Sequence, residues 1–174
     1  GYTAAGVSGR MPMAQLADAI VQYSRETLEK AIRIIHSRKD WRGAKVVYGD
    51  TDSLFVEVPN VSRDEAFRIG DEIQKEVTRQ NPRPIRLQFE KVFHPCFLVT
   101  KKRYVGFAYE TPDQKRPSFL PKGIECVRRD NCRAVQRMME RSLKMLFETK
   151  NLSQVKSYLQ NEWKALLNNK VQPR

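Results

Sequence analysis

The sequence predicts an α+β fold, a ferredoxin-like split β-α-β-β-α-β arrangement that lacks its first strand and is followed by a helical segment. Helical and alternating hydrophobic patterns follow one another in the order α-β-β-α-β. A glycine-containing acidic turn separates the two consecutive strands, as in a tight hairpin. Further strands come next, and beyond residue 130 the pattern is helical to the end of the chain.

A long amphipathic helix is expected first, from Pro12 to about Arg38. Proline suits the first turn of a helix, where a backbone N–H has no partner within the helix. Small or apolar residues recur at helical spacing on one side and predict a face that packs on a sheet. They are Met13, Leu16, Ala17, Ile20, Ser24, Leu28, Ala31 and Ile35.

The functional prediction depends on residues 48–53, Tyr-Gly-Asp-Thr-Asp-Ser. The β-prone segments 46–47 and 54–58 flank this stretch, and its glycine permits a sharp bend. Asp50 and Asp52 lie one residue apart at the tip of the expected hairpin, so both carboxylates can face one cation. Magnesium ions prefer such oxygen ligands and share them with waters and substrate phosphates. The alternative is an ordinary solvent-exposed turn, in which aspartate is common.

A second helix is expected to begin after Ser62, which forms a capping box with Glu65, and to end before Asn81. Residues 85–89 alternate between apolar and polar side chains, which predicts a half-buried strand. Further strand-like pieces are residues 97–100, 103–109 and 119–120.

The chain carries 32 lysines and arginines against 20 acidic residues, a formal net charge of +12. A folded protein this basic commonly meets a polyanion, most often nucleic acid, although a basic surface can also serve solubility alone. Residues 101–104, Lys-Lys-Arg-Tyr, join three cations to a flat ring, a combination suited to phosphates, sugars and bases. The alternative is a charged strand edge that prevents aggregation.

A helix is expected after residue 130, with a break near Asn151 and a second cap at Ser153. Four of its cations fall on one side, and like charges at this spacing cost helix stability, which favours a polyanion partner over a solubility surface. They are Arg133, Arg137, Arg141 and Lys144, with Arg128 and Arg129 just before them.

Several functional classes are excluded. Three cysteines and two histidines are too few and too irregularly spaced for a disulfide framework or a zinc site. No glycine-rich phosphate loop is present, which excludes a P-loop NTPase. No apolar run is long enough for a helix that crosses a bilayer. The chain lacks an initiator methionine, so we expect it to be part of a longer polypeptide.

Four segments, in order, resemble motifs of the B-family DNA polymerases, and the resemblance covers essentially the whole chain. It implies that residues 1–10 end the fingers, 11–124 form the palm and 125–174 begin the thumb. The four segments are Gly1-Tyr2-Thr3 (the tail of motif B), residues 48–53 (motif C), residues 101–104 (the basic palm motif), and Lys122–Glu125 with Val127–Asp130 (the entry to the thumb).

The resemblance implies transfer of a deoxynucleotide from a dNTP to a primer 3′-hydroxyl by two-metal-ion catalysis. Asp52 would be the principal ligand of the metals and Asp50 a secondary one, with Glu90 and Ser53 in support. The implied cofactor is a pair of Mg²⁺ ions, for which Mn²⁺ can substitute. The residues implied beside the nucleotide are Tyr2 and Thr51.

The implied partners are primer–template DNA, the rest of the polymerase chain and accessory subunits, in the nucleus and without a membrane. Arg133 departs from the family, whose members usually place proline there. The residues implied to contact DNA are Lys101, Lys102, Arg103 and Tyr104 near the growing end, and Lys122, Arg128 and Arg129 where the duplex leaves.

Within the family, residues 1–5, 8–12 and 140–144 are most similar to members that extend primers past damaged or mismatched ends. One alternative is a replicative member of the family, and another is a catalytically inactive, polymerase-like DNA-binding module. We expect the 174 residues alone to be inactive, because the partner carboxylate would lie on the absent strand.

Overall fold

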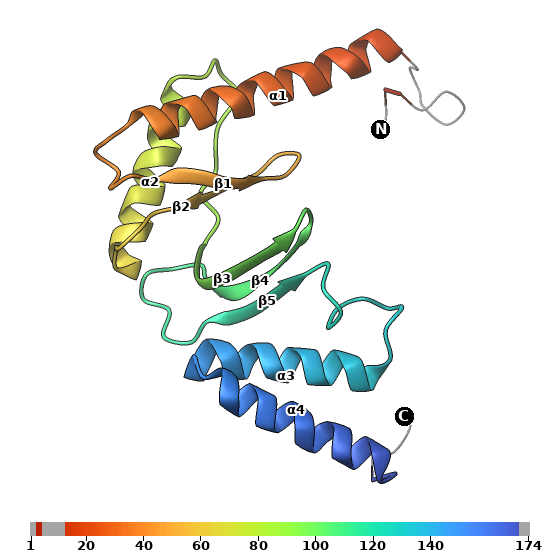
Figure 1. The fold of residues 1–174 in the computed structure, drawn as a ribbon. Helices are drawn as coiled ribbons and strands as arrows, with labels where there is room; N and C mark the ends of the chain where they lie inside the picture. Colours follow the sequence, from red (N-terminus) through yellow and green to blue (C-terminus); the bar gives the residue numbers. More distant parts are fainter. Residues whose placement is uncertain (1–2, 5–12, 171–174) are drawn as a thin grey trace. The chain divides into compact units, whose positions relative to one another are not determined.

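The structure, a computed structural model, describes residues 3–4 and 13–170 of the chain. The described residues form four helices and five strands, and the strands make antiparallel sheets of two and three members (Figure 1). This confirms the predicted α+β class. The elements are α1 (Ala14–Ser37), β1 (Lys45–Gly49), β2 (Leu54–Glu57), α2 (Arg63–Arg79), β3 (Val92–Thr100), β4 (Arg103–Tyr109), β5 (Ser118–Lys122), α3 (Arg133–Thr149) and α4 (Leu152–Leu167).

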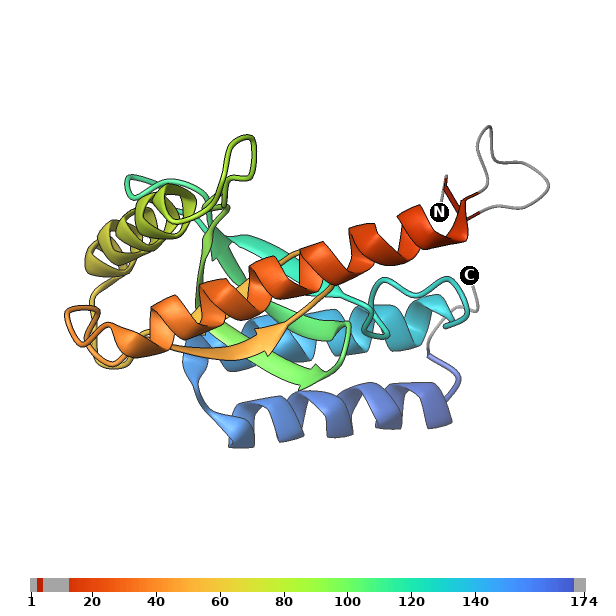
Figure 2. The ribbon, with the colours of Figure 1, turned by 90° about the horizontal axis from the view of Figure 1, so that it is seen from above.

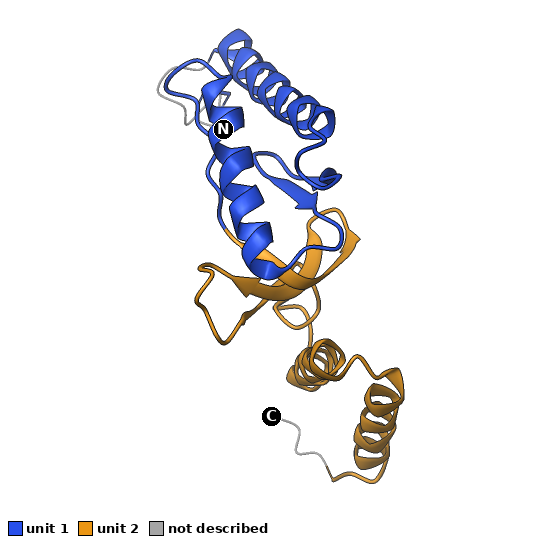
Figure 3. Ribbon diagram, turned by 90° about the vertical axis from the view of Figure 1, so that its left-hand side faces the viewer, with its two compact units in different colours: residues 1–90 blue, residues 91–174 orange. Residues whose placement is uncertain are grey.

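The chain divides into two compact units, residues 1–90 and 91–174, which are described separately (Figure 3). Unit 1 holds α1, α2 and the two-stranded sheet, and unit 2 holds the three-stranded sheet with α3 and α4. The predicted division into fingers, palm and thumb is a functional one and stays a prediction.

The core of unit 1 lies between the C-terminal half of α1, α2 and the β1–β2 hairpin. Only this half of α1 packs as predicted. Leu16 and Ile20, in the N-terminal half, are about half exposed (48% and 51%), so the expectation that the whole apolar side is buried was wrong there. The buried residues are Ala31, Ile34, Ile35, Trp41, Ala44, Ile69, Ile73 and Val77.

β1 and β2 form the predicted antiparallel hairpin. Val46 pairs with Val56, and Tyr48 pairs with the adjoining residue of β2, Phe55. Val47 is therefore an extra residue in β1 and forms a β-bulge. Beyond the bulge Gly49 faces Leu54, which leaves residues 50–53 as the connecting turn. His36 accepts a hydrogen bond from the backbone N–H of Val46 (3.0 Å), which ties the end of α1 to β1. Figure 2 shows the hairpin running alongside α1.

Ser62 caps α2 as predicted, because its hydroxyl accepts a hydrogen bond from the backbone N–H of Glu65 (3.2 Å). The strand predicted at residues 85–89 was wrong. Side chains of α2 take the place of a neighbouring strand there. The backbone N–H of Leu87 donates to Thr78 Oγ1 (3.0 Å), and that of Phe89 donates to Gln74 Oε1 (2.6 Å).

In unit 2, β4 is the central strand and pairs with β3 on one side and β5 on the other. α3 packs on this sheet through Phe147, whose ring lies 5.2 Å from that of Phe107 and 5.0 Å from that of Phe97. Val105 and Ile124 complete the buried core.

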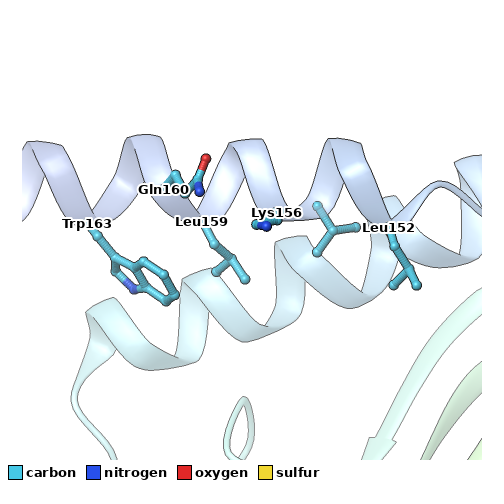
Figure 4. A pocket seen from close by; sticks show the side chains of 6 residues that line it. Leu152, Lys156, Leu159, Gln160 and Trp163 are labelled. Atoms are coloured by element: carbon cyan, nitrogen blue, oxygen red, sulfur yellow. The ribbon is translucent and has the colours of Figure 1, made fainter.

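α4 runs alongside α3, as Figure 2 shows. The cap predicted at Ser153 was wrong by two residues, since the Asn151 carboxamide accepts hydrogen bonds from the backbone N–H groups of Ser153 and Gln154 (3.0 and 3.3 Å). Leu152, Leu159 and Trp163 extend from one side of α4 and line a shallow surface pocket (Figure 4). Among the described residues, no helix is long and apolar enough to cross a membrane.

Candidate catalytic carboxylates and nucleic-acid interface

The acidic turn between β1 and β2 is closed by its own backbone and side chains. The N–H of Asp50 donates to the carbonyl of Ser53 (2.9 Å). The Asp50 carboxylate in turn accepts hydrogen bonds from the Thr51 N–H (2.8 Å) and hydroxyl (3.3 Å) through the same oxygen. Asp52 is exposed at the tip. The two carboxylates are therefore unequal, because one is fixed by the turn and the other faces solvent.

Asp50 and Asp52 provide the hard oxygen donors that a magnesium ion prefers, so the residues fit such a metal in kind. They are too few to complete a site. Over residues 3–4 and 13–170, no three acidic, histidine or cysteine side chains gather closely enough to hold a metal. Glu90, the predicted supporting acid, is exposed at the end of unit 1 and makes no such group with the two aspartates. Tyr2 lies outside the described residues.

The basic turn between β3 and β4 consists of Lys101 and Lys102, because Thr100 pairs with Arg103 across the hairpin. Both lysines are exposed, and Lys102 has the left-handed backbone conformation (φ 61°) that a tight turn requires. The ring of Tyr104 is half-buried and meets the ring of Phe93 edge to face. The sheet therefore presents two lysines at one end.

The segment after β5 lies against this basic turn. Lys122 pairs with Tyr104 across the sheet and is exposed. Gly123, the next residue, has φ 65°, and a side chain there would overlap the backbone carbonyl of Lys102. The close approach brings Lys101, Lys102 and Lys122 to the same end of the three-stranded sheet. We call these three lysines, with Arg103 and Tyr104, the basic end of the sheet.

Arg103 is held by an acid that the sequence pattern did not indicate. Its guanidinium donates a hydrogen bond to the carboxylate of Glu125, and each side chain is about one-third exposed (36% and 32%). A hydrogen bond to its own backbone, together with Arg103, lowers the pKa of Glu125, although burial opposes this. Glu125 is 22 residues away along the chain, so only the pairing of β4 with β5 reveals the contact.

The arginines at the predicted entry to the thumb differ from each other. Arg128 makes a two-pronged pair with Asp130, Nε to Oδ1 at 3.0 Å and Nη2 to Oδ2 at 2.5 Å. Its hydrogen bond to Asp130 raises the pKa of Arg128 and lowers that of the carboxyl group. Arg129 is exposed. Only Arg129 therefore presents an uncompensated charge here.

The cationic side predicted along α3 is shorter than expected. Arg133 and Arg137 are exposed near the start of the helix. Arg141 stacks on the ring of Tyr158 in α4 (5.0 Å). Lys144 pairs with Glu140 (2.5 Å) and lies over the ring of Phe119 (5.0 Å). A helical wheel gives the direction of a side chain but not whether its long stem folds back onto the protein.

Comparison with known proteins identifies the family of the chain. A sequence profile of DNA polymerase family B matches residues 1–173. The DNA polymerase zeta catalytic subunit of Arabidopsis thaliana is 57% identical over 171 residues, 98% of this chain and 9% of the relative. That of Saccharomyces cerevisiae is 58% identical over 163 residues, 94% of this chain and 11% of the relative.

The DNA polymerase delta catalytic subunit of Plasmodium falciparum is 36% identical over 176 residues, covering 98% of this chain and 16% of the relative. The chain thus spans a small part of the length of each of these relatives, and it shares more residues with the two zeta subunits than with this delta subunit. With the profile match over almost its whole length, the chain belongs to DNA polymerase family B.

Proposed function

We propose that this chain forms the palm (11–124) and the beginning of the thumb (125–174) of a zeta-type, template-directed DNA polymerase, with residues 1–10 as the end of the fingers. The observation that carries the proposal is the self-closed acidic turn, which exposes Asp52 beside a fixed Asp50 in a family B sequence. A strand from elsewhere in the polymerase would pair beside the β1–β2 hairpin and give unit 1 the order β-α-β-β-α, which is the split palm arrangement without the last strand, predicted at residues 85–89.

Asp52 would be the principal metal ligand, because its carboxylate is exposed. Asp50 would be a secondary ligand, held in direction by its hydrogen bonds from Thr51. Further ligands would come from water, substrate phosphates and the missing strand, which is why these residues alone are expected to be inactive. When bound, two divalent ions, proposed as Mg²⁺ with Mn²⁺ as a substitute, supply charge stabilisation to the attacking and leaving oxygens.

The remaining residues of the proposed catalytic centre have supporting roles. The carbonyl of Ser53 closes the turn by accepting from Asp50. Thr51 is exposed at the tip, and we propose that it contacts the incoming nucleotide, as does Tyr2, which lies outside the described residues. Glu90 would support the metal site only when the polymerase is complete.

The DNA would lie on the cations of unit 2. The exposed lysines of the basic end of the sheet are proposed to face phosphates near the growing end of the primer. Tyr104 offers a ring and hydroxyl beside them. Arg128 and Arg129 precede α3, where the duplex would leave. The high positive charge of the chain supports this assignment.

The decisive experiment replaces Asp52 with alanine in the full-length polymerase. We expect primer extension to fall by at least about 1,000-fold, equivalent to about 4 kcal/mol of transition-state stabilisation. DNA affinity should stay within about twofold, because the turn carries no cation. The matched control is Asp18→Ala, which removes an exposed acid from α1. Extension at the wild-type rate by Asp52→Ala would contradict the catalytic assignment.

A delta-type replicative polymerase and an inactive DNA-binding module are the alternatives. The higher identity to the zeta subunits than to the delta subunit favours the zeta type, and hence translesion synthesis in the nucleus. Extension from a mismatched primer end distinguishes the zeta type from the delta type. A wild-type enzyme that extends only matched ends would favour the replicative type, and one that binds DNA without extending any primer would favour the inactive module.

A further inference from the structure

An acidic residue stands within the basic end of the sheet. Glu125 lies two residues after Gly123, which itself touches the Lys101–Lys102 turn. A carboxylate in a surface that binds a polyanion lowers affinity through repulsion, unless it has another role. The structure shows what Glu125 contacts.

Glu125 holds the side chain of Arg103 along the surface of the unit. The guanidinium donates to the carboxylate, and about two-thirds of each side chain is covered. A side chain at Gly123 would come within 3.3 Å of Arg103 Cγ, so the stem of Arg103 runs beside Gly123 on its way to Glu125. Arg103 thus spans from β4 to the segment after β5.

The same segment also supports the basic turn through its backbone. Gly123 and Lys102 both have positive φ values (65° and 61°), and the absence of a side chain at Gly123 lets it approach the Lys102 carbonyl. One backbone contact and one ion pair therefore join the Lys101–Lys102 turn to the segment that follows Lys122.

We propose that Glu125 is a positioning residue for DNA binding. By holding Arg103 it fixes the segment after β5 against the basic turn, so that Lys101, Lys102 and Lys122 keep one arrangement toward the phosphates. Arg103 serves this support and does not itself neutralise a phosphate. The inference rests on the proposed DNA-binding function. It assigns phosphate binding to the three lysines of the basic end, and support of the basic turn to Arg103.

Two consequences separate this role from simple charge counting. An arginine already paired with a carboxylate releases no counterion from DNA, whereas each phosphate-bound lysine contributes about 0.9 to the slope of log affinity against log salt. Removing an acid that only repels DNA should tighten binding. Removing a positioning acid should weaken it.

The first test measures the affinity of the full-length polymerase for a primer–template duplex. Glu125→Gln should weaken binding by about fivefold, the upper range for a partly exposed ion pair. The charge swap Arg103→Glu with Glu125→Arg should restore affinity to within about twofold, because it rebuilds the pair. The matched control, Glu110→Gln, removes an exposed acid just beyond the opposite end of β4 and should leave affinity unchanged. Tighter binding by Glu125→Gln, or no recovery in the swap, would overturn the inference.

The second test measures the salt slope with variants that keep the charge of the pair at zero. Arg103→Gln with Glu125→Gln should leave the slope unchanged, while Lys101→Gln should reduce it by about 0.9. A reduction of about 0.9 in the double variant would make Arg103 a phosphate contact and refute its supporting role. An unchanged slope for Lys101→Gln would instead count against the proposed DNA-binding surface, so the two failures are distinguishable.

Discussion

The β1–β2 and β3–β4 hairpins end in turns of opposite charge, and the two turns are fixed in different ways. The hydrogen bonds that close the acidic turn join neighbouring residues, Asp50 with Ser53 and Thr51 with Asp50. The basic turn has contacts with residues far along the chain, since Gly123 approaches Lys102 and Glu125 holds the adjoining Arg103. Contacts within a hairpin thus close the acidic turn, whereas the segment after β5 also supports the basic turn.

This difference matches what each turn is proposed to do. Two carboxylates that bind one metal site have to be fixed relative to each other over a few ångströms, which hydrogen bonds within a short turn can provide. Cations that follow a DNA backbone have to keep their spacing over several phosphates, and only tertiary contacts between separate segments can hold such spacing. The following predictions test the contrast, from the largest expected effect to the smallest.

The two aspartates of the acidic turn should contribute unequally. Asp52→Asn removes the exposed charge, and we expect at least about a 1,000-fold loss in single-turnover primer extension. Asp50→Asn should cost only about 10- to 100-fold, because the carboxamide oxygen can still accept the Thr51 hydrogen bonds and Asp50 is proposed as a secondary ligand. A metal titration for each variant checks the assignment. Equal losses would show that the turn does not distinguish its carboxylates.

The basic turn should be sensitive to a methyl group on a distant glycine. Gly123→Ala would place Cβ against the Lys102 carbonyl, and over-packing of this kind costs about 1–3 kcal/mol. If about 1.4 kcal/mol of this appears in DNA binding, affinity falls about tenfold. The rate of extension at saturating DNA should change by less than about twofold, since only binding is affected.

Gly43→Ala is the matched control for this prediction. Gly43 has a similar positive φ (74°), but a side chain there would meet nothing within 4 Å. The control therefore imposes a similar cost of left-handed backbone, about 1–2 kcal/mol, without the collision. Equal loss of DNA affinity in both variants would mean that the contact with Lys102 does not fix the basic turn.

The contact between α1 and α2 should weaken at acidic pH. Hydrogen bonds from Arg79, Gln80 and Arg38 lower the pKa of Glu76 to about 2, although burial opposes them. Because the folded pKa lies below its usual value of 4.5, this stabilisation is present above pH 4.5 and is lost as the pH falls toward 2. Arg38 follows α1 and Glu76 lies in α2, so the cluster joins the two helices.

Hydrogen exchange of the α2 peptide in the full-length protein measures this effect. After correction for the intrinsic pH dependence of amide exchange, Glu76→Gln should flatten the loss of protection between pH 4.5 and pH 2, because the group that titrates is gone. Glu72→Gln, which removes a carboxylate paired with Arg68 within α2, is the control. If both variants keep the wild-type pH profile, Glu76 does not join the helices.

The sequence predicted the features that depend on neighbouring residues. The four helices, the hairpin and the Ser62 cap each follow from a local pattern, and each is present. Residues 85–89 have the alternation of a strand, yet their N–H groups bond to the Thr78 and Gln74 side chains. Alternation predicts an extended, half-buried backbone and does not say what its hydrogen-bonding partner is.

The candidate site divides in the same way. The acidic turn was predictable because its residues are contiguous, and its geometry makes the two aspartates unequal. The pairing of Arg103 with Glu125 was not predictable from the charge pattern, because 22 residues separate them. The stacking of Arg141 on Tyr158 likewise depends on how two helices pack.

The β-bulge at Val47 has a consequence for how the acidic turn can vary. The bulge places Val46 and Tyr48 on opposite faces of the hairpin, because Val46 pairs with Val56 and Tyr48 pairs with the adjoining residue, Phe55. Deleting Val47 would therefore keep these pairs and the face of every later residue of β1, and would remove only the local bend and twist that the bulge adds. Asp50 and Asp52 would remain, but the turn that carries them would point in a different direction. Loss of function by this one-residue deletion would thus come from a redirected hairpin, with the chemistry of the turn intact.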